Sequence, residues 1–346
     1  MRGQVSKIHS DFYYAVPLNI ADNGVENEAE NAVKSKVYEC KAREVLKKQK
    51  QKICTGDIVE VENGYITRIY PRKSYIPRPP VANINQAVIV SAVKEPELDF
   101  HQLDRYISFA EYYNLEIKLC FNKNDLSSDD KLIERVFSIY EPLGYDIVFT
   151  SALEGFEIDV FEEILSGKLS VLCGQSGVGK SSLINSLNSE FELRTKPVSE
   201  KHGRGTHTTR HCEIVEVSDG IRVIDTPGFS NLKFDFLLPK NVSGLFREFR
   251  GVKCKFADCL HIHEDGCGVL ENIKNISLER YESYLEFVKE AELYKKKIKS
   301  QSEKIESGYK QNFNKITVKV SAKKRQSSRR TAKQDLYKNS RELENE

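Results

Sequence analysis

The residues best suited to chemistry run from Gly174 to Ser181, where the sequence reads G-x-x-x-x-G-K-S. Glycines at this spacing let backbone N–H groups turn toward the α and β phosphates of a nucleotide. Lys180 is placed to reach the β and γ phosphates as a catalytic cation, and the Ser181 hydroxyl is placed for Mg²⁺. A glycine-rich turn that binds nothing is the alternative. The residues predicted to contact the nucleotide here are Gly174, Gln175, Ser176, Gly177, Val178, Gly179, Lys180, Ser181 and Ser182.

A second candidate is the sequence N-K-x-D, from Asn122 to Asp125. An aspartate carboxylate can accept two hydrogen bonds, from the N1–H and the exocyclic amine of guanine, and adenine offers neither in that arrangement. The motif therefore favours GTP: Asp125 would read the base, Lys123 would cover it and Asn122 would tie this loop to the phosphate loop. An ordinary polar turn is the alternative. The predicted base-binding residues are Asn122, Lys123, Asn124, Asp125 and, through backbone amides, Ser151 and Ala152.

A third candidate is the sequence D-x-x-G, from Asp225 to Gly228. The Asp225 carboxylate would hold Mg²⁺ through water, and the Gly228 amide would contact the γ phosphate. Upstream, the polar segment 203–209 offers Thr208, with Thr209 as the other candidate, as a second hydroxyl for Mg²⁺ in the triphosphate state. A plain surface loop explains that segment about as well. Together the three motifs predict a site for GTP and Mg²⁺.

A fourth group is the sequence C-x4-C-x-H-x5-C, formed by Cys254, Cys259, His261 and Cys267. Three thiolates and one imidazole fit a closed tetrahedral Zn²⁺ site. Such a site is structural, because no position remains for a reacting water. His263 is the competing imidazole, and buried thiols that bind nothing are the alternative.

Short strands are predicted for the first domain, residues 1–75, because apolar and polar residues alternate between turn signals. About five such strands indicate a small β barrel of the OB type, a fold that often holds RNA. The proline-rich stretch 71–80 cannot continue a helix or a central strand, so it is the first linker. The strands are expected at Val5 to Ile8, Phe12 to Val16, Val37 to Ala42, Gly56 to Val61 and Tyr65 to Tyr70.

Apolar strands alternate with amphipathic helices across the second domain, residues 81–235. This pattern predicts a mostly parallel α/β sheet that is covered on both faces, with a hairpin formed by residues 213–217 and 221–224. Ligands bind at the carboxyl ends of such strands, so the three nucleotide motifs should meet there. The strands are expected at Ala87 to Val93, Ile117 to Phe121, Asp146 to Thr150, Leu169 to Cys173 and Ile221 to Ile224.

The order of these motifs is unusual, because the base-reading loops precede the phosphate loop. A site built from converging loops does not need a particular chain order, so the pattern indicates a circular permutation of the domain. One consequence is that the segment after Gly228, which would sense the γ phosphate, runs directly into the C-terminal region. The nucleotide state is therefore expected to be passed to that region.

Charge is distributed unevenly along the 346 residues. Positions 295 to 333 hold 14 basic and 2 acidic residues, whereas residues 1–294 hold 37 basic and 45 acidic residues. The basic end suggests a polyanionic partner, and a solvated tail without function is the alternative. A helix should begin after Ser277, and the chain beyond Lys299 should be disordered when free. Eight cysteines without a signal peptide or a long apolar run predict a reducing cytoplasmic compartment and no membrane span.

In combination, the motif order, the phosphate loop, the H-T-T segment and the Cys/His spacing make residues 1 to about 300 similar to the RsgA (YjeQ) family of circularly permuted GTPases. Asn83-x-Asn85-Gln86 and Leu103-Asp104-Arg105-Tyr106 also resemble the family, although Asn85 stands where aspartate is expected. The resemblance implies an OB-fold domain (1–75), a permuted GTPase domain (81–235), a zinc-finger and helical domain (239–300) and a basic tail (301–346).

The resemblance also implies a function: hydrolysis of GTP to GDP in late maturation of the small ribosomal subunit, stimulated by its rRNA. The protein would act as a cytoplasmic monomer. By similarity, His207 positions the attacking water. Phe229 stands where many GTPases carry a water-orienting glutamine, so slow intrinsic turnover is expected. An RNA-binding scaffold that keeps GTP as a structural ligand is the alternative. An ATP-driven nucleic-acid enzyme is disfavoured by Asp125.

Overall fold

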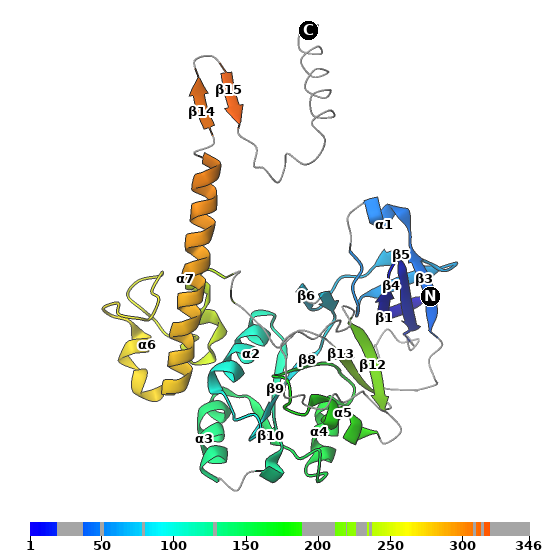
Figure 1. Cartoon of the computed structure of the whole chain (residues 1–346), viewed down its shortest axis with the longest axis horizontal. Coiled ribbons are helices and arrows are strands. Elements are labelled where there is room, and N and C mark those ends of the chain that lie inside the picture. Colours follow the sequence, from blue (N-terminus) through cyan, green and yellow to red (C-terminus); the bar gives the residue numbers. More distant parts are fainter. Residues whose placement is uncertain are drawn as a thin grey trace, which may run out of the picture.

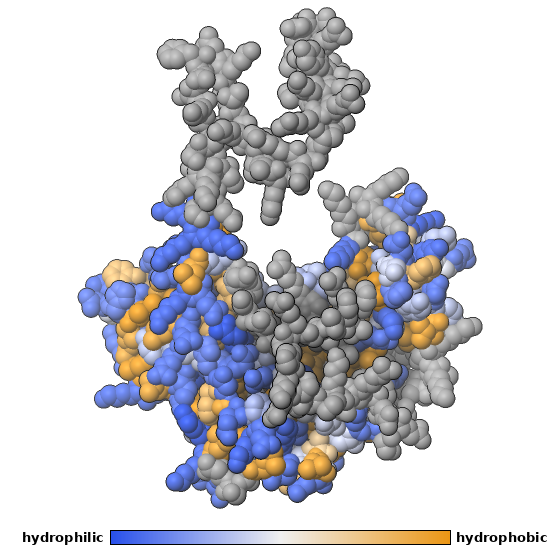
Figure 2. All heavy atoms as spheres, viewed as in Figure 1, coloured by the Kyte–Doolittle hydropathy of each residue, from blue (hydrophilic) through white to orange (hydrophobic). Residues whose placement is uncertain are grey.

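The computed structural model describes residues 1–18, 37–48, 52–77, 80–126, 130–188, 212–218, 220–225, 234, 237–306, 309–312 and 315–318. An α/β domain lies between a β barrel and a C-terminal domain that carries a long helix (Figure 1). The face of the molecule seen in Figure 2 is largely hydrophilic, with apolar residues scattered over it. Within the described ranges, no helix combines the length and the apolar character needed to cross a membrane.

The N-terminal domain is a closed barrel of five strands, as the sequence predicts. The strands pair in the order β1, β2, β3, β5, β4, and β4 returns to pair with β1. Alternate residues such as Val5, Val59 and Ile66 point inward and are fully buried, which explains the period of two in the sequence. The bounds are β1 (Arg2–His9), β2 (Phe12–Pro17), β3 (Tyr38–Ala42), β4 (Ile58–Glu62) and β5 (Tyr65–Ile69), with a short helix α1 (Glu44–Lys48) after β3.

The linker between the first two domains contains a small hairpin that the sequence did not predict. Its strands, β6 (Tyr75–Pro77) and β7 (Pro80–Ala82), pair with each other, and Val81 of β7 also forms a single bridge with Thr55. A two-stranded pair can include prolines at its ends, because it has few ladder hydrogen bonds to lose.

The central domain is built on a six-stranded sheet in the order β10, β9, β8, β11, β13, β12. All neighbours are parallel except β12, which pairs antiparallel with β13, as predicted. Successive residues of β8 are buried on opposite faces: Ala87 and Ile89 pack with α2 and α3, and Val88 and Val90 pack with α4 and α5. The strands are β8 (Gln86–Ala92), β9 (Glu116–Asn122), β10 (Asp146–Phe149), β11 (Leu169–Cys173), β12 (Glu213–Ser218) and β13 (Ile221–Asp225).

Helices cover both faces of this sheet (Figure 1). α3, α4 and α5 each bury one side, whereas α2 is buried all round from Leu103 to Glu111. The helices are α2 (Phe100–Tyr112), α3 (Asp130–Tyr140), α4 (Ile158–Leu165) and α5 (Lys180–Leu187), with 3-10 turns η1 (Asn124–Leu126) and η2 (Glu141–Leu143).

The C-terminal domain packs short 3-10 turns and one long helix around an aromatic core. The rings of Phe246 and Phe249 meet the ring of Tyr284 edge-on, and Phe287 is fully buried beside them. The elements are η3 (Pro239–Asn241), η4 (Ser243–Leu245), η5 (Arg247–Phe249), α6 (Gly268–Glu271), η6 (Ile273–Asn275) and α7 (Leu278–Glu306).

The structure departs from the sequence prediction at the start of the tail. Residues 301–306 continue α7, and β14 (Tyr309–Asn312) pairs with β15 (Lys315–Val318) in a hairpin. The basic composition predicted disorder from 301 onward, but lysine, glutamate and glutamine also favour helix, so the helix continues. The predicted tail from 319 to 346 lies outside the described residues.

Candidate nucleotide and metal sites

One edge of the sheet collects the predicted nucleotide motifs. β8, β9, β10, β11 and β13 are parallel, so their carboxyl ends lie on the same edge. Asn122 ends β9, Ser151 follows β10 by two residues, Gly174 follows β11, and Asp225 ends β13. In such sheets this edge is where ligands bind.

The phosphate loop fits closely against its neighbours, and two glycines make this possible. Gly174 has a φ of 150°, and a Cβ there would lie 2.1 Å from the Val90 carbonyl oxygen. Gly179 has a φ of 96°, and a Cβ there would lie 2.1 Å from Asn122 Nδ2. Any side chain at either position would collide with β8 or with the base loop, so glycine is required.

Asn122 joins the phosphate loop to the base loops, which is the contact that the sequence predicts. Its Nδ2 donates to the Val178 carbonyl oxygen at 2.9 Å, and its Oδ1 accepts from the Ala152 amide at 3.1 Å. The Ser151 hydroxyl donates to Asp125 Oδ1 at 2.6 Å. Asp125, Ser151, Ala152 and the phosphate loop therefore belong to one hydrogen-bonded unit.

Lys180 opens α5 with its ammonium group turned back over the loop. Its Nζ donates to the carbonyl oxygens of Gly174 and Gln175, both at 2.8 Å. Burial lowers the pKa of this ammonium group. A phosphate would supply the negative charge that two carbonyl dipoles provide only in part, and the N-terminus of α5 favours an anion at the same place. Ser181 and Ser182 follow in the first turn of the helix.

Several predicted site residues are not located by the structure. His207, Thr208 and Gly228 lie outside the described residues, and Asp225 is described only as the last residue of β13. Their roles stay predictions. Lys123 is described and has a φ of 63°, with its Nζ donating to the Glu95 carbonyl oxygen.

The four predicted metal ligands converge in the C-terminal domain. The ligand atoms of Cys254, Cys259, His261 and Cys267 all lie within 4.8 Å of one another, and this group could hold a metal ion. His261 Nδ1 lies 3.5 Å from Cys254 Sγ and 3.3 Å from Cys267 Sγ, and the two sulfurs are 4.0 Å apart. Three of the four ligands are buried, whereas His263 is exposed and lies outside the group.

The loop that carries His261 is held by α7 and by an internal carboxylate. Tyr281 and Tyr284 of α7 donate their hydroxyls to the carbonyl oxygens of His261 and Leu260, at 2.8 and 2.6 Å. Glu264 accepts from nearby backbone amides. Burial alone would raise the pKa of Glu264, but these bonds outweigh it and hold that pKa at about 2. The eight cysteines all fall in the described part of the chain, and no disulfide joins any of them.

The sequence prediction missed the charged junction between α2 and α7. Arg280, 1% exposed, donates to Asp104 at 2.7 Å and to Glu248 at 2.8 Å. Arg105 donates to both carboxylate oxygens of Glu290, at 2.6 and 2.9 Å. Asp104 and Arg105 lie in the stretch Leu103 to Tyr106 that resembles a family motif. The sequence alone did not indicate which residues they contact.

The sheet, the phosphate loop and the loop that contains Asp125 define the class as a P-loop GTPase whose base-side strands precede its phosphate loop. A family model described as RsgA GTPase matches residues 69–235, and a second, described as 50S ribosome-binding GTPase, matches residues 170–307. The chain belongs to the RsgA GTPase family.

Relatives and solved structures agree with this assignment. Small ribosomal subunit biogenesis GTPase RsgA of Agathobacter rectalis is 38% identical over 295 residues, which cover 82% of this chain and 96% of that protein. The protein of the same name from Caldanaerobacter subterraneus subsp. tengcongensis is 41% identical, over 73% of this chain and 88% of its own. YjeQ from Thermotoga maritima, a crystal structure, superposes with a TM-score of 0.71 at 33% identity and covers 84% of this chain and 98% of its own. The crystal structure of YloQ, titled a circularly permuted GTPase, superposes with a TM-score of 0.66 at 29% sequence identity. The match covers 84% of this chain and 94% of YloQ.

Proposed function

We propose that this protein hydrolyses GTP to GDP and phosphate and acts in biogenesis of the small ribosomal subunit. The observation that carries the proposal is the bond from Asn122 to Val178, which brings the base loop against the phosphate loop. The relatives are named for the same activity and the same assembly process. No separate observation favours a scaffold without turnover.

We assign each motif the role that its chemistry supports. Asp125 reads guanine, supported by Ser151 and by the Ala152 amide, while Lys123 and Asn124 complete the base loop. Residues 174–182 bind the phosphates, with Lys180 as the principal cation. Ser181, Thr208 and, through water, Asp225 would hold Mg²⁺, which neutralises charge on the phosphates when bound. The Gly228 amide would contact the γ phosphate.

Turnover by the isolated protein should be slow. Phe229 cannot orient a water molecule, and His207 is the residue to which we assign that task. Docking to the small subunit and its rRNA would order the loops that complete the site and so raise turnover. We further propose that the protein acts as a monomer in the cytoplasm.

The Cys/His group fits Zn²⁺ in a structural role. Tetrahedral Zn–S and Zn–N bonds place neighbouring ligand atoms about 3.6 to 3.8 Å apart. The distances of 3.3, 3.5 and 4.0 Å within the group lie around that value. Four protein ligands close the coordination sphere, so this Zn²⁺ would stabilise the C-terminal domain and take no part in hydrolysis.

The test is phosphate release from GTP by the full chain, with and without purified small subunits. We expect slow release alone, faster release with small subunits and no hydrolysis of ATP. Lys180→Ala should abolish release, and Lys168→Ala, at an exposed ion pair with Glu116 far from this edge, should not. Equal rates with and without subunits, or ATP used as readily as GTP, would contradict the proposal.

A further inference from the structure

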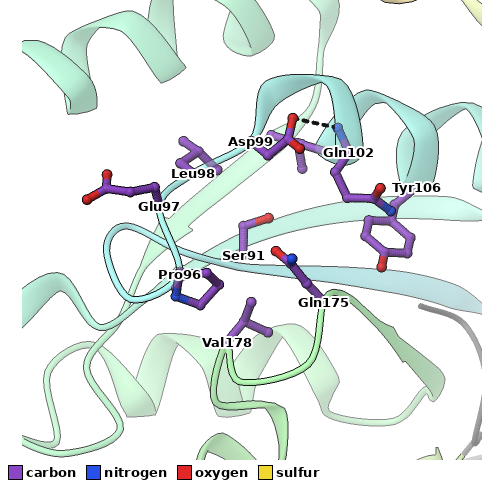
Figure 3. Close-up of a pocket in the computed structure, with 11 residues that line it drawn as sticks. Ser91, Pro96, Glu97, Leu98, Asp99, Gln102, Tyr106, Gln175 and Val178 are labelled. Atoms are coloured by element: carbon purple, nitrogen blue, oxygen red, sulfur yellow. Dashed lines mark hydrogen bonds between the residues drawn. The ribbon is translucent and has the colours of Figure 1, made fainter. Parts of the chain in front are cut away.

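A narrow cavity lies between the phosphate loop and the beginning of α2 (Figure 3). Gln102 and Tyr106 enter it from α2, Gln175 enters from the phosphate loop, and Ser91 enters from β8. Residues four positions apart share one side of a helix, so Gln102 and Tyr106 face the loop together. Polar side chains of the phosphate loop and of α2 therefore face each other across this cavity.

Two polar atoms beside this cavity, Gln102 Nε2 and the Tyr106 hydroxyl, are buried; they interact weakly with each other, and neither has a well-formed hydrogen bond. Tyr106 is only 2% exposed. Burial raises its pKa to about 12, against a smaller opposite effect of Gln102, so the hydroxyl keeps its proton at neutral pH. Unpaired buried polar groups are rare because they cost stability. Two groups without a well-formed bond beside the phosphate loop can still bond to Gln175, which enters the same cavity.

The same helix is fixed to the C-terminal domain by other side chains. His101 Nε2 lies 2.9 Å from a Glu286 oxygen, and Arg105 is paired with Glu290 through two bonds. The first two turns of α2 thus carry the residues that face the phosphate loop and, on other sides, those that contact α7.

We propose that Gln102 and Tyr106 are positioning residues that hydrogen-bond Gln175 and so hold the phosphate loop when GTP is bound, and that the ion pairs between α2 and α7 let the C-terminal domain determine where these two residues stand. This inference rests on the proposed function, since it requires GTP at the phosphate loop. The mechanical link is short: the Gln175 carbonyl oxygen is one of the two that accept from Lys180 Nζ. A shift of Gln175 therefore moves a partner of the ammonium group that reaches the phosphates.

The first experiment uses Tyr106→Phe, which removes a hydroxyl and keeps the ring. Without GTP, we expect the midpoint of thermal unfolding to stay or rise, because a buried hydroxyl without a well-formed bond is removed. We expect kcat for GTP to fall by about fivefold, the factor that corresponds to one ordinary hydrogen bond. Tyr112→Phe, at a tyrosine of the same helix that is 39% exposed, is the matched control and should change neither quantity. A kcat equal to that of the wild type would overturn the role of Tyr106.

A double-mutant cycle that combines Tyr106→Phe with Gln175→Leu tests whether Tyr106 acts through Gln175. If Tyr106 acts through Gln175, the double variant should be no slower than Gln175→Leu alone. If the two substitutions instead lower kcat by independent factors that multiply, Tyr106 does not act through Gln175.

The second experiment tests the contribution of the C-terminal domain with Glu290→Gln. We expect faster amide hydrogen exchange in residues 174–179 and a slower kcat. Glu279→Gln is the control, since Glu279 also lies on α7 but contacts Arg135 of α3. Unchanged amide hydrogen exchange of residues 174–179 in Glu290→Gln would show that the C-terminal domain does not act on the phosphate loop through this ion pair. A wild-type protein that neither binds nor hydrolyses GTP would contradict the proposed function, whereas an active wild type with an equally active Tyr106→Phe variant would contradict only the inference.

Discussion

The α/β domain has two junctions, and they are built from different contacts. At the C-terminal junction the contacts are charged and buried: Arg280 lies between Asp104 and Glu248, and all three side chains are less than a tenth exposed. Glu111, 7% exposed on its side chain, receives two further arginines of the C-terminal domain, Arg247 and Arg250, each at 2.6 Å.

At the barrel junction the contacts are hydrogen bonds, backbone pairing and one exposed ion pair between Lys7 and Glu213. The Thr55 hydroxyl donates to the Cys212 carbonyl oxygen at 2.9 Å, and Arg222 donates to the amide oxygen of Gln4 at 2.9 Å. β1 joins β12 through one residue pair. Within the described residues, no buried ion pair crosses this junction.

The difference teaches which domain moves with the nucleotide site. A buried charge that loses its partner is strongly destabilising, so the C-terminal junction tolerates little rearrangement. Hydrogen bonds to neutral acceptors and an exposed ion pair at a small contact are weaker and can be exchanged for contacts with water. We therefore expect the α/β and C-terminal domains to move as one body, with the barrel able to adjust against them.

The largest effect is expected from Arg280→Met, which leaves Asp104 and Glu248 buried without their cation. The loss in unfolding free energy should be about 3–5 kcal/mol. Urea unfolding measures it, with Arg135→Met as control. Arg135 forms an ion pair at the same junction but is 52% exposed, so its loss should be at most about 1 kcal/mol. Equal losses for the two variants would break the distinction between buried and exposed pairs.

A smaller effect is expected on acidification, through Glu290. Burial pushes the pKa of this carboxyl up, but the Arg105 guanidinium, with help from His101 and the Phe234 amide, leaves it below its usual value. Its contribution to stability is therefore present above the unfolded-state pKa of about 4.3 and is lost as pH falls through the folded pKa. The stability difference between wild type and Glu290→Gln, followed by urea unfolding across pH, should be constant near neutral pH and vanish in acid. A difference that does not depend on pH would contradict this.

At the barrel junction, Thr55→Val removes the bond to Cys212 and keeps the shape of the side chain. The expected loss is about 1 kcal/mol, the net contribution of an ordinary hydrogen bond. Small-angle scattering should show a wider spread of barrel orientations, while hydrogen exchange in the C-terminal domain stays unchanged. If the C-terminal domain responds as well, the two junctions are not independent.

The smallest effect is expected from Lys7→Ala at the same junction. Its ion pair with Glu213 is exposed by more than two fifths on both sides. Exposed pairs contribute little, so the change should be less than about 0.5 kcal/mol and should disappear in high salt. A loss near that of Arg280→Met would remove the contrast between the junctions.

The elements that surround the nucleotide edge could be predicted from the sequence because their signals are local. Strand and helix periods, the glycines of the phosphate loop and the turn before β13 each lie within a few residues. The same holds for Tyr284 and Val288, whose helical spacing marks the buried face of α7. The contact of Asn122 with the phosphate loop was predicted from its motif rather than from its periodicity.

The charged junction could not be predicted, because its partners are far apart and look like surface residues. Arg280 and Asp104 are separated by 176 positions, and an isolated arginine or aspartate is normally exposed. Gln102 and Tyr106 could be assigned to a helix but not to a cavity, since only the folded structure brings Gln175 opposite them. The hairpin of β6 and β7 was missed because proline argues against strands in general.

The length of α7 has a consequence for how the molecule could be sensed by a partner. The helix is anchored in its domain as far as Ala291, which is fully buried, and it continues to Glu306 beyond that anchor (Figure 1). Fifteen further residues extend about 22 Å at 1.5 Å per residue, so a tilt of 10° at the base displaces the tip by about 4 Å. A small rotation of the domain is thus converted into a shift of atomic dimensions at a distant point. The free end of α7 therefore moves further than its anchored part, which is held in the aromatic core of the domain.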